Sequence, residues 1–181
     1  QFRCNGSDGY LAWLDNTLQI RETANKTLEG IDYDFRIFDD PQELHNTIIE
    51  KNKSKNKSRM VAGYCWDWIS KKDRSIKDIK ISDYEATWNL NEHGQAWIIH
   101  PESVSEVGCI HTSQGLELDY VGVIIGTDLI VRNNKIISDV TKRASTDRSV
   151  HTWKRLMEED PEATSARLDA IIKNTYRTLM T

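Results

Sequence analysis

Residues 111–119 read HTSQGLELD and separate two apolar stretches, EVGCI at 106–110 and YVGVIIG at 120–126. The second stretch is rich in Val and Ile and has no charge, which is typical of a parallel strand covered on both faces. A polar insertion around Gly115 between such stretches is either a tight turn or a binding site. As a site it has a clear logic, because the glycine lets the backbone approach a ligand and Glu117 can accept hydrogen bonds from ribose-like hydroxyls.

The hydroxyl groups within this segment extend the same argument. Thr112 and Ser113, together with nearby backbone N–H groups, supply the hydrogen-bond donors that phosphate oxygens require. The residues alone allow a second explanation equally well. In it, the segment is a simple turn between two strands, and its polar side chains have no binding role. The two interpretations stay open at this point.

The composition is that of one globular domain spanning 1–181. The chain has 38% hydrophobic and 29% charged residues, with a net charge of −4, so any nucleic-acid contact must come from a local patch. No apolar run reaches the roughly 18–20 residues of a membrane span, and no signal peptide is visible. Three widely spaced cysteines fit reduced thiols and predict a cytoplasmic protein.

Three helices are predicted from caps and apolar spacing. Asp40 followed by Pro41 begins one helix, and Asp160 followed by Pro161 begins the last one, which runs to the end of the chain. Leucines at helical spacing over 11–18 predict a helix near the N-terminus, capped by Ser7 or Asp8.

Strands alternate with these helices, which predicts an α/β fold with a mainly parallel sheet. Residues 59–66 are expected to include a short buried strand, and 120–126 a second one. Residues 31–38 alternate between apolar and charged side chains, the period of a half-covered outer strand. Two β-branched arms around Asn133 and Asn134 predict an inserted β-hairpin at about 129–138.

A second candidate site follows the strand at 59–66. Trp66 and Trp68 lie in the loop CWDW and either stack on single-strand bases or pack in the core, and the basic residues near it are Lys71, Lys72, Arg74, Lys77 and Lys80. The cysteines match no nucleophile signature, and the histidines have no metal-ligand spacing. No metal site is therefore predicted.

The segment IHTSQGLELDYVGVIIG resembles motif V of superfamily 1 DNA and RNA helicases. QFR at 1–3 resembles the motif that opens the second RecA-like domain of these enzymes, and NTYRTLMT at 174–181 resembles the beginning of motif VI. With the AGYCWDW stretch at 62–68, the whole chain resembles the C-terminal half of a helicase-like family of unknown function grouped with Schlafen-type helicase domains.

The resemblance implies a RecA-like, P-loop NTPase-like domain of three layers and assigns roles to individual residues. Arg3 stabilises the transferring phosphoryl group, a task that suits guanidinium geometry. Gln114 and Gly115 lie at the ATP cleft, and Glu117 contacts the ribose. The residues expected to face nucleic acid are His111, Thr112 and Ser113, with Trp66 and Trp68 as further candidates. The motif VI arginine is expected directly after Thr181.

The parent protein is accordingly expected to be an ATP-dependent helicase or translocase. No GxxxxGK[ST] occurs in the chain, so a P-loop domain upstream of Gln1 is expected to hold ATP and Mg²⁺, and the chain alone is expected to be inactive and to bind neither. The expected partners are that domain and single-stranded DNA or RNA, with no membrane. The alternative is a non-catalytic binding module on a degenerate RecA-like fold. A metal-dependent nuclease is a third option, for which the sequence has no acidic signature.

Overall fold

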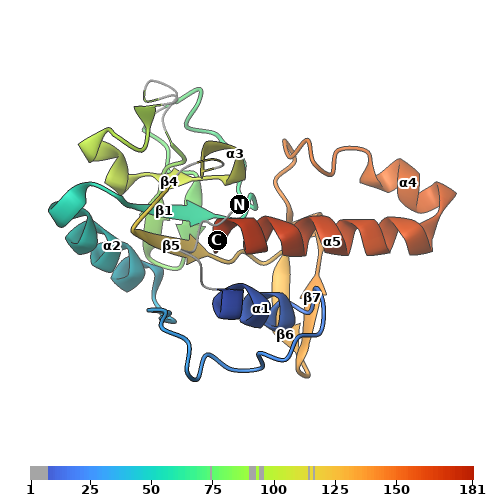
Figure 1. The fold of residues 1–181 in the computed structure, drawn as a ribbon. Coiled ribbons are helices and arrows are strands. Elements are labelled where there is room, and N and C mark those ends of the chain that lie inside the picture. Colours follow the sequence, from blue (N-terminus) through green and yellow to red (C-terminus); the bar gives the residue numbers. More distant parts are fainter. Residues whose placement is uncertain (1–7, 74, 90–92, 94–95, 114, 116) are drawn as a thin grey trace.

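A computed structural model describes residues 8–73, 75–89, 93, 96–113, 115 and 117–181 (Figure 1). The elements follow the chain in the order α1 Asp8–Thr17, α2 Pro41–Lys55, β1 Ser58–Ala62, β2 Ile79–Ile81, β3 Tyr84–Ala86, η2 Pro101–Ser105, β4 Val107–Gly108, α3 Ile110–Ser113, β5 Tyr120–Ile124, β6 Leu129–Arg132, β7 Lys135–Ser138, η3 Val140–Lys142, α4 Trp153–Glu159 and α5 Pro161–Leu179. No described helix is long and apolar enough to cross a membrane.

The central sheet is parallel, with the strand order β4-β1-β5. All five residues of β1 are buried, as expected for the middle strand of a sheet covered on both faces. The alternation of its side chains shows the two faces directly. Met60 and Ala62 pack in one hydrophobic cluster and Val61 packs in the other.

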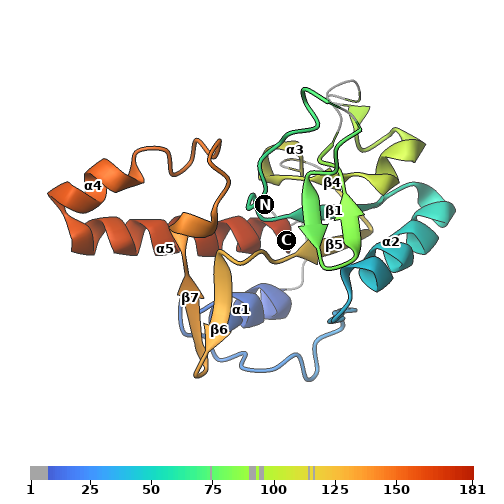
Figure 2. The ribbon, with the colours of Figure 1, turned by 180° about the vertical axis from the view of Figure 1, so that it is seen from behind.

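Helices cover both faces of this sheet, which gives an α/β fold in three layers. The cluster around Val61 contains residues of α1 and α5, including Leu14, Ile172 and Tyr176. The cluster around Met60 contains Ile48 of α2 and residues of the small antiparallel sheet β2-β3. From the main body, α4 and the N-terminal part of α5 extend outward as an arm (Figures 1 and 2).

The predicted caps of α2 and α5 are confirmed, whereas Asp8, one of the two caps expected for the first helix, is the first residue of α1 itself and Ser7 lies outside the described residues. Asp40 accepts a hydrogen bond from the N–H of Gln42 and Pro41 is the first residue of α2. Asp160 accepts from the N–H of Ala163 at the start of α5. Because each side chain satisfies an N–H that the helix itself leaves unpaired, both starts are fixed locally.

The predicted hairpin is confirmed as well. Leu129 pairs with Ser138 and Arg132 with Lys135, so the turn consists of Asn133 and Asn134. Their φ angles are 51° and 59°, the left-handed pair that a two-residue hairpin turn of this hand requires.

The predicted strand at 31–38 is wrong. The segment is extended, but its internal bonds join residues two apart, from Tyr33 N–H to Ile31 C=O and from Phe35 N–H to Tyr33 C=O. None of the described strands pairs with it. The alternation instead places aromatic rings on α1, where Tyr33 stacks on Tyr10 with 3.7 Å between centroids. The apolar side chains at every second position of this segment are therefore covered by the surface of α1 rather than by a layer packed on a sheet.

Candidate functional site

The HTSQGLELD segment connects β4 to β5 through the single turn α3. The N–H groups of Thr112 and Ser113 both bond to the carbonyl of Cys109 at 3.0 Å. Gly115 then has a φ of +88°, a backbone conformation that side chains rarely adopt, and open space surrounds the position of a Cβ. The glycine is thus required by the turn and at the same time leaves the backbone accessible.

Hydroxyl groups tie this turn to the protein interior. Thr112 donates a 2.7 Å hydrogen bond to the side-chain oxygen of Asn89, which is buried and whose own N–H bonds to Val107. Ser113 donates to the carbonyl of Cys109 at 3.2 Å. Sequence reasoning missed Asn89, because only the fold brings this residue beside the turn.

The structure therefore separates the predicted site residues by their environment. His111 is exposed at α3, and Gly115 and Glu117 are exposed in the turn, free of steric cover. Thr112 and Ser113 are half-buried, with their hydroxyl protons already directed at protein acceptors. Arg3 and Gln114 lie outside the described residues.

The end of the segment is fixed against the start of β1. The N–H of Asp119 donates to the carbonyl of Lys57 at 2.8 Å, and its carboxylate lies 3.4 Å from the ammonium of Lys55. The exposed ion pair contributes little, whereas the backbone bond sets the register in which β5 begins.

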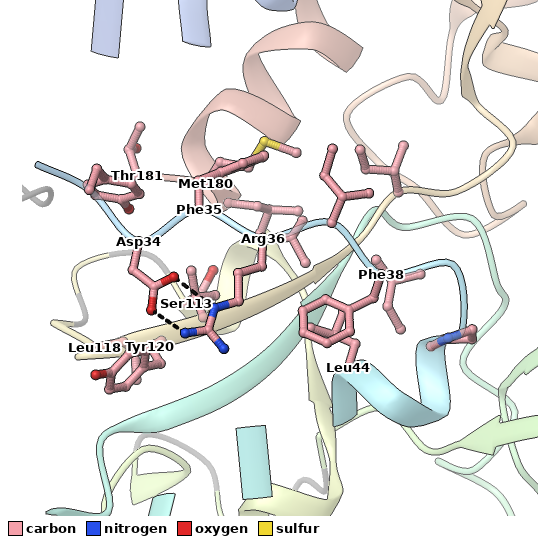
Figure 3. A pocket seen from close by; sticks show the side chains of 18 of the residues that line it. Asp34, Phe35, Arg36, Phe38, Leu44, Ser113, Leu118, Tyr120, Met180 and Thr181 are labelled. Carbon is pink, nitrogen blue, oxygen red and sulfur yellow. Dashed lines mark hydrogen bonds and ion pairs between the residues drawn. The ribbon is translucent and has the colours of Figure 1, made fainter. Parts of the chain in front are cut away.

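A groove of about 540 Å³ lies beside this segment. It is bordered by Ser113, Leu118 and Tyr120 on one side. Another side is formed by the end of α5 and the two residues after it, Thr178 to Thr181. The extended segment 33–39 forms a third border (Figure 3). Glu117 is not among the lining residues.

The groove has a charged pair that the sequence did not single out. Arg36 binds the Asp34 carboxylate through two hydrogen bonds of 2.8 and 3.1 Å, and this contact raises the pKa of Arg36 above its usual value. Both side chains lie on the groove side of the segment, facing Tyr120 (Figure 3). In the sequence these charges alternate with apolar residues as on the solvent face of a strand, a pattern that does not mark them as site residues.

Helix α1 fixes the end of α5 at the groove. The Tyr10 hydroxyl donates to the Met180 carbonyl at 2.9 Å, and Arg177 pairs with the buried Asp15, which also binds Arg21 at 2.8 Å. Burial opposes ionisation of Asp15, but the hydrogen bonds from the two arginines outweigh it and lower the pKa. Arg177, which lies inside the motif VI-like sequence, therefore has a structural role through its pairing with Asp15 of α1.

The two tryptophans of the CWDW loop pack against the core. Trp66 is half-buried, with its ring 6.5 Å from that of Trp88, and its carbonyl accepts from the Trp88 indole. Trp68 is half-buried too, and the Lys71 ammonium lies 3.9 Å from the centre of its ring. Asp67 between them accepts hydrogen bonds from Ser145. This environment favours the packing interpretation of these rings.

A buried polar cluster lies at the carboxyl ends of β1 and β5. Arg143 binds Asp128 at 2.9 Å and also pairs with Asp147. Tyr176 of α5 donates to Asp128 and accepts from the N–H of Gly126. These residues lock together the base of the hairpin and α5, and every charge in the cluster has a partner.

Cys65 borders this cluster, with its sulfur 3.9 Å from the Tyr176 hydroxyl. Burial, followed by the negative charge of Asp128, raises the pKa of its thiol to about 12, so the thiol is protonated at neutral pH. Within the described part of the chain, no group of three or more His, Cys, Asp or Glu residues is arranged to hold a metal ion.

Comparison with known proteins supplies a family. The family model of the Schlafen group 3 DNA/RNA helicase domain matches residues 1–181. A curated relative, the uncharacterized protein YPL245W of Saccharomyces cerevisiae (strain ATCC 204508 / S288c), is 28% identical over 144 residues, which cover 71% of this chain and 31% of that protein. The chain thus spans about a third of that relative. No solved structure matches. On the evidence of the full-length match, the chain belongs to the Schlafen group 3 DNA/RNA helicase domain family.

Proposed function

We propose that this chain is the second, RecA-like motor domain of an ATP-dependent DNA or RNA helicase or translocase. In this function it closes over ATP that a P-loop domain elsewhere in the protein holds, and it contacts single-stranded nucleic acid. The observation that carries the proposal is the juxtaposition of two motif-like segments. Residues of HTSQGLELD and the last residues of NTYRTLMT border the same groove.

The described residues fit one side of a nucleotide. Gly115 leaves the backbone open to a ligand, and Glu117 presents an exposed carboxylate that can accept hydrogen bonds from ribose hydroxyls. The Mg²⁺ ion and the triphosphate are assigned to the proposed P-loop domain, because the sequence of this chain has no GxxxxGK[ST] motif to hold them. ATP supplies the free energy, and this chain orients the nucleotide and excludes water.

The nucleic-acid contact is proposed for the face around α3. His111 is exposed there, and Thr112, fixed by Asn89, keeps the turn rigid beneath it. A rigid turn that joins a nucleotide-facing edge to a nucleic-acid-facing edge is the kind of element that couples closure of a cleft to movement along a strand. Trp66 and Trp68 contribute as a packed support, since both are half-buried against the core.

Nucleic-acid-stimulated ATP hydrolysis by the full-length protein tests the proposal. We expect Glu117→Ala to reduce the stimulated rate by about tenfold or more, because a ligand contact to the bound nucleotide is lost. Glu102→Ala is the matched control, since Glu102 is an exposed carboxylate of η2 and lies outside the HTSQGLELD segment. Equal rates for both variants and the parent protein contradict the proposal and favour a non-catalytic binding module.

A further inference from the structure

Gln19 covers one edge of the β6-β7 hairpin. Gln19, which follows α1, accepts a 3.1 Å hydrogen bond from the N–H of Ile136 and donates at 2.9 Å to the carbonyl of Asn134. These contacts occupy the outer edge of β7 in the way that a neighbouring strand does. The hairpin is therefore a fixed part of the surface rather than a loose loop.

On the outer edge of β6, the described residues provide no such cover. Val131 pairs with Ile136, and because the Ile136 N–H points outward to Gln19, the peptide groups of Val131 point outward on the opposite edge. No bond from another part of the described chain reaches them, and the Val131 side chain is 69% exposed. An open strand edge of this kind is a template for pairing with a further strand.

The face of the hairpin beside this edge is apolar at its middle and basic at its tip. Ile130 and Ile137 are directly opposite each other and each is 37% exposed. Arg132 and Lys135, both exposed, form the next opposite pair on this face, an arrangement of like charges that costs stability. Within the described ranges no carboxylate pairs with either cation.

We propose that the open edge of β6 binds an extended, acidic segment of a partner protein, which adds to the hairpin as a third strand. Main-chain hydrogen bonds to Val131 provide the pairing, the isoleucine pair contacts alternate apolar side chains, and carboxylates of the segment neutralise Arg132 and Lys135. The hairpin lies beside α1 and away from α3 in both views, so this proposal is independent of the proposed motor function (Figures 1 and 2).

Two other occupants fit less well. A nucleic acid matches the cations but has no backbone that can pair with the Val131 peptide groups. A second copy of β6 matches the edge but brings only its own Arg132, without a carboxylate, so the cationic pair stays uncompensated. An acidic peptide satisfies both features.

Peptide binding to the 181-residue chain tests the proposal. The probe is a fluorescein-labelled peptide with the sequence Glu-Val-Glu-Val-Glu-Val, and its basic counterpart has Lys in place of Glu. Fluorescence anisotropy at low salt measures affinity, and amide chemical shifts locate the site. We expect the acidic peptide to bind at least about tenfold more tightly than the basic one and to shift the amides of residues 130–132.

Two sets of variants separate the main-chain and charge contributions. Val131→Pro removes the outward N–H while leaving the ladder to β7 in place, and we expect about a tenfold loss of affinity for the acidic peptide. Arg132→Glu combined with Lys135→Glu is expected to reverse the preference toward the basic peptide. Lys26→Glu combined with Lys53→Glu gives the same change of net charge at exposed positions elsewhere and is expected to leave affinity unchanged.

Three results overturn the proposal. The first is equal binding of the acidic peptide by the parent chain and Val131→Pro, with unchanged thermal unfolding as evidence that the variant is folded. The second is displacement of the peptide by single-stranded oligo-dT, with binding of that oligonucleotide lost in the charge-reversal variant and retained in Val131→Pro. The third is self-association of the parent chain in sedimentation that Val131→Pro abolishes.

Discussion

The Tyr10 hydroxyl donates a 2.9 Å hydrogen bond to the carbonyl of Met180, a residue 170 positions further along the chain. It joins the start of the chain to the last turn of α5, where helix carbonyls have no partner within the helix. Tyr10 also stacks on Tyr33 of the segment that borders the groove. One buried side chain therefore sets the positions of two of the groove's three borders.

Tyr10→Phe is expected to destabilise the chain by about 1–2 kcal/mol, because the buried Met180 carbonyl loses its donor while the ring stacking is kept. Chemical denaturation measures the change in the free energy of unfolding. Tyr120→Phe is the control, since Tyr120 is 40% exposed, and it is expected to change stability by less than about 0.5 kcal/mol. Similar values for the two variants contradict the role assigned to Tyr10.

Asp15→Asn tests the carboxylate that binds Arg177 and Arg21. Because the pKa of Asp15 is lowered in the folded protein, its ionised form contributes stability that is present above the pKa of an unfolded Asp, about 3.9, and is lost as pH falls through the folded value. We expect the variant to be less stable by about 1–3 kcal/mol at pH 7 and the difference to shrink in acid.

The control for this prediction is Asp34→Asn. Asp34 also pairs with an arginine, but both side chains are about half exposed, with relative exposures of 50% and 56%. Removing an exposed pair is expected to cost less than about 1 kcal/mol. Unfolding curves between pH 2 and pH 7 distinguish the two variants, and parallel pH profiles rule out the assigned role of Asp15.

Gly63→Ala and Gly115→Ala are expected to act for different reasons. A Cβ at Gly63 meets the Tyr176 hydroxyl oxygen at 2.0 Å, so the variant must displace a buried ring and is expected to lose about 1–3 kcal/mol or more. A Cβ at Gly115 meets nothing within 4 Å, and only the φ of +88° opposes the change, at about 1 kcal/mol. Thermal unfolding of both variants checks the order.

Thr112→Val and His111→Ala are expected to distinguish a residue that stabilises the HTSQGLELD segment from a residue that contacts a ligand. Thr112→Val leaves the buried Asn89 oxygen without its 2.7 Å donor and is expected to cost about 1–2 kcal/mol. His111→Ala removes an exposed side chain and is expected to leave stability unchanged while weakening single-strand binding by the full-length protein. A large loss of stability in His111→Ala would show that this residue is structural instead.

Local signals predicted the elements that depend on local contacts. The caps at Asp40 and Asp160 and the Asn133-Asn134 turn are decided by neighbours within a few residues, and each is found where the sequence places it. The uncharged β-branched run at 120–126 predicted the strand β5 but not its environment, because β5 lies at the edge of the described sheet and only Gly122 and Ile124 within it are buried.

The groove and its supports could not be derived in this way. Residues 31–38 have a strand's period, but whether a strand or a helix surface covers their apolar side is decided by distant parts of the chain, here by Tyr10 and Trp13. Asn89 and Arg36 are ordinary polar residues in the sequence, and only the fold brings them to the site. The sequence does not predict the short strands β2 and β3, since three residues are too few for a period to be recognised.

The ion pair between Asp128 and Arg143 has a consequence for how the chain can vary. It closes the hairpin at its base, and Tyr176 fixes that base to α5. The residues between the two charges therefore form a loop that projects from the central sheet. Extra residues inserted between Asn133 and Asn134 lengthen only the tip of the hairpin and leave its base unchanged. A single residue inserted between Gly126 and Asp128 shifts the anchor itself. Length variation among related chains is accordingly expected at the tip and not at the base.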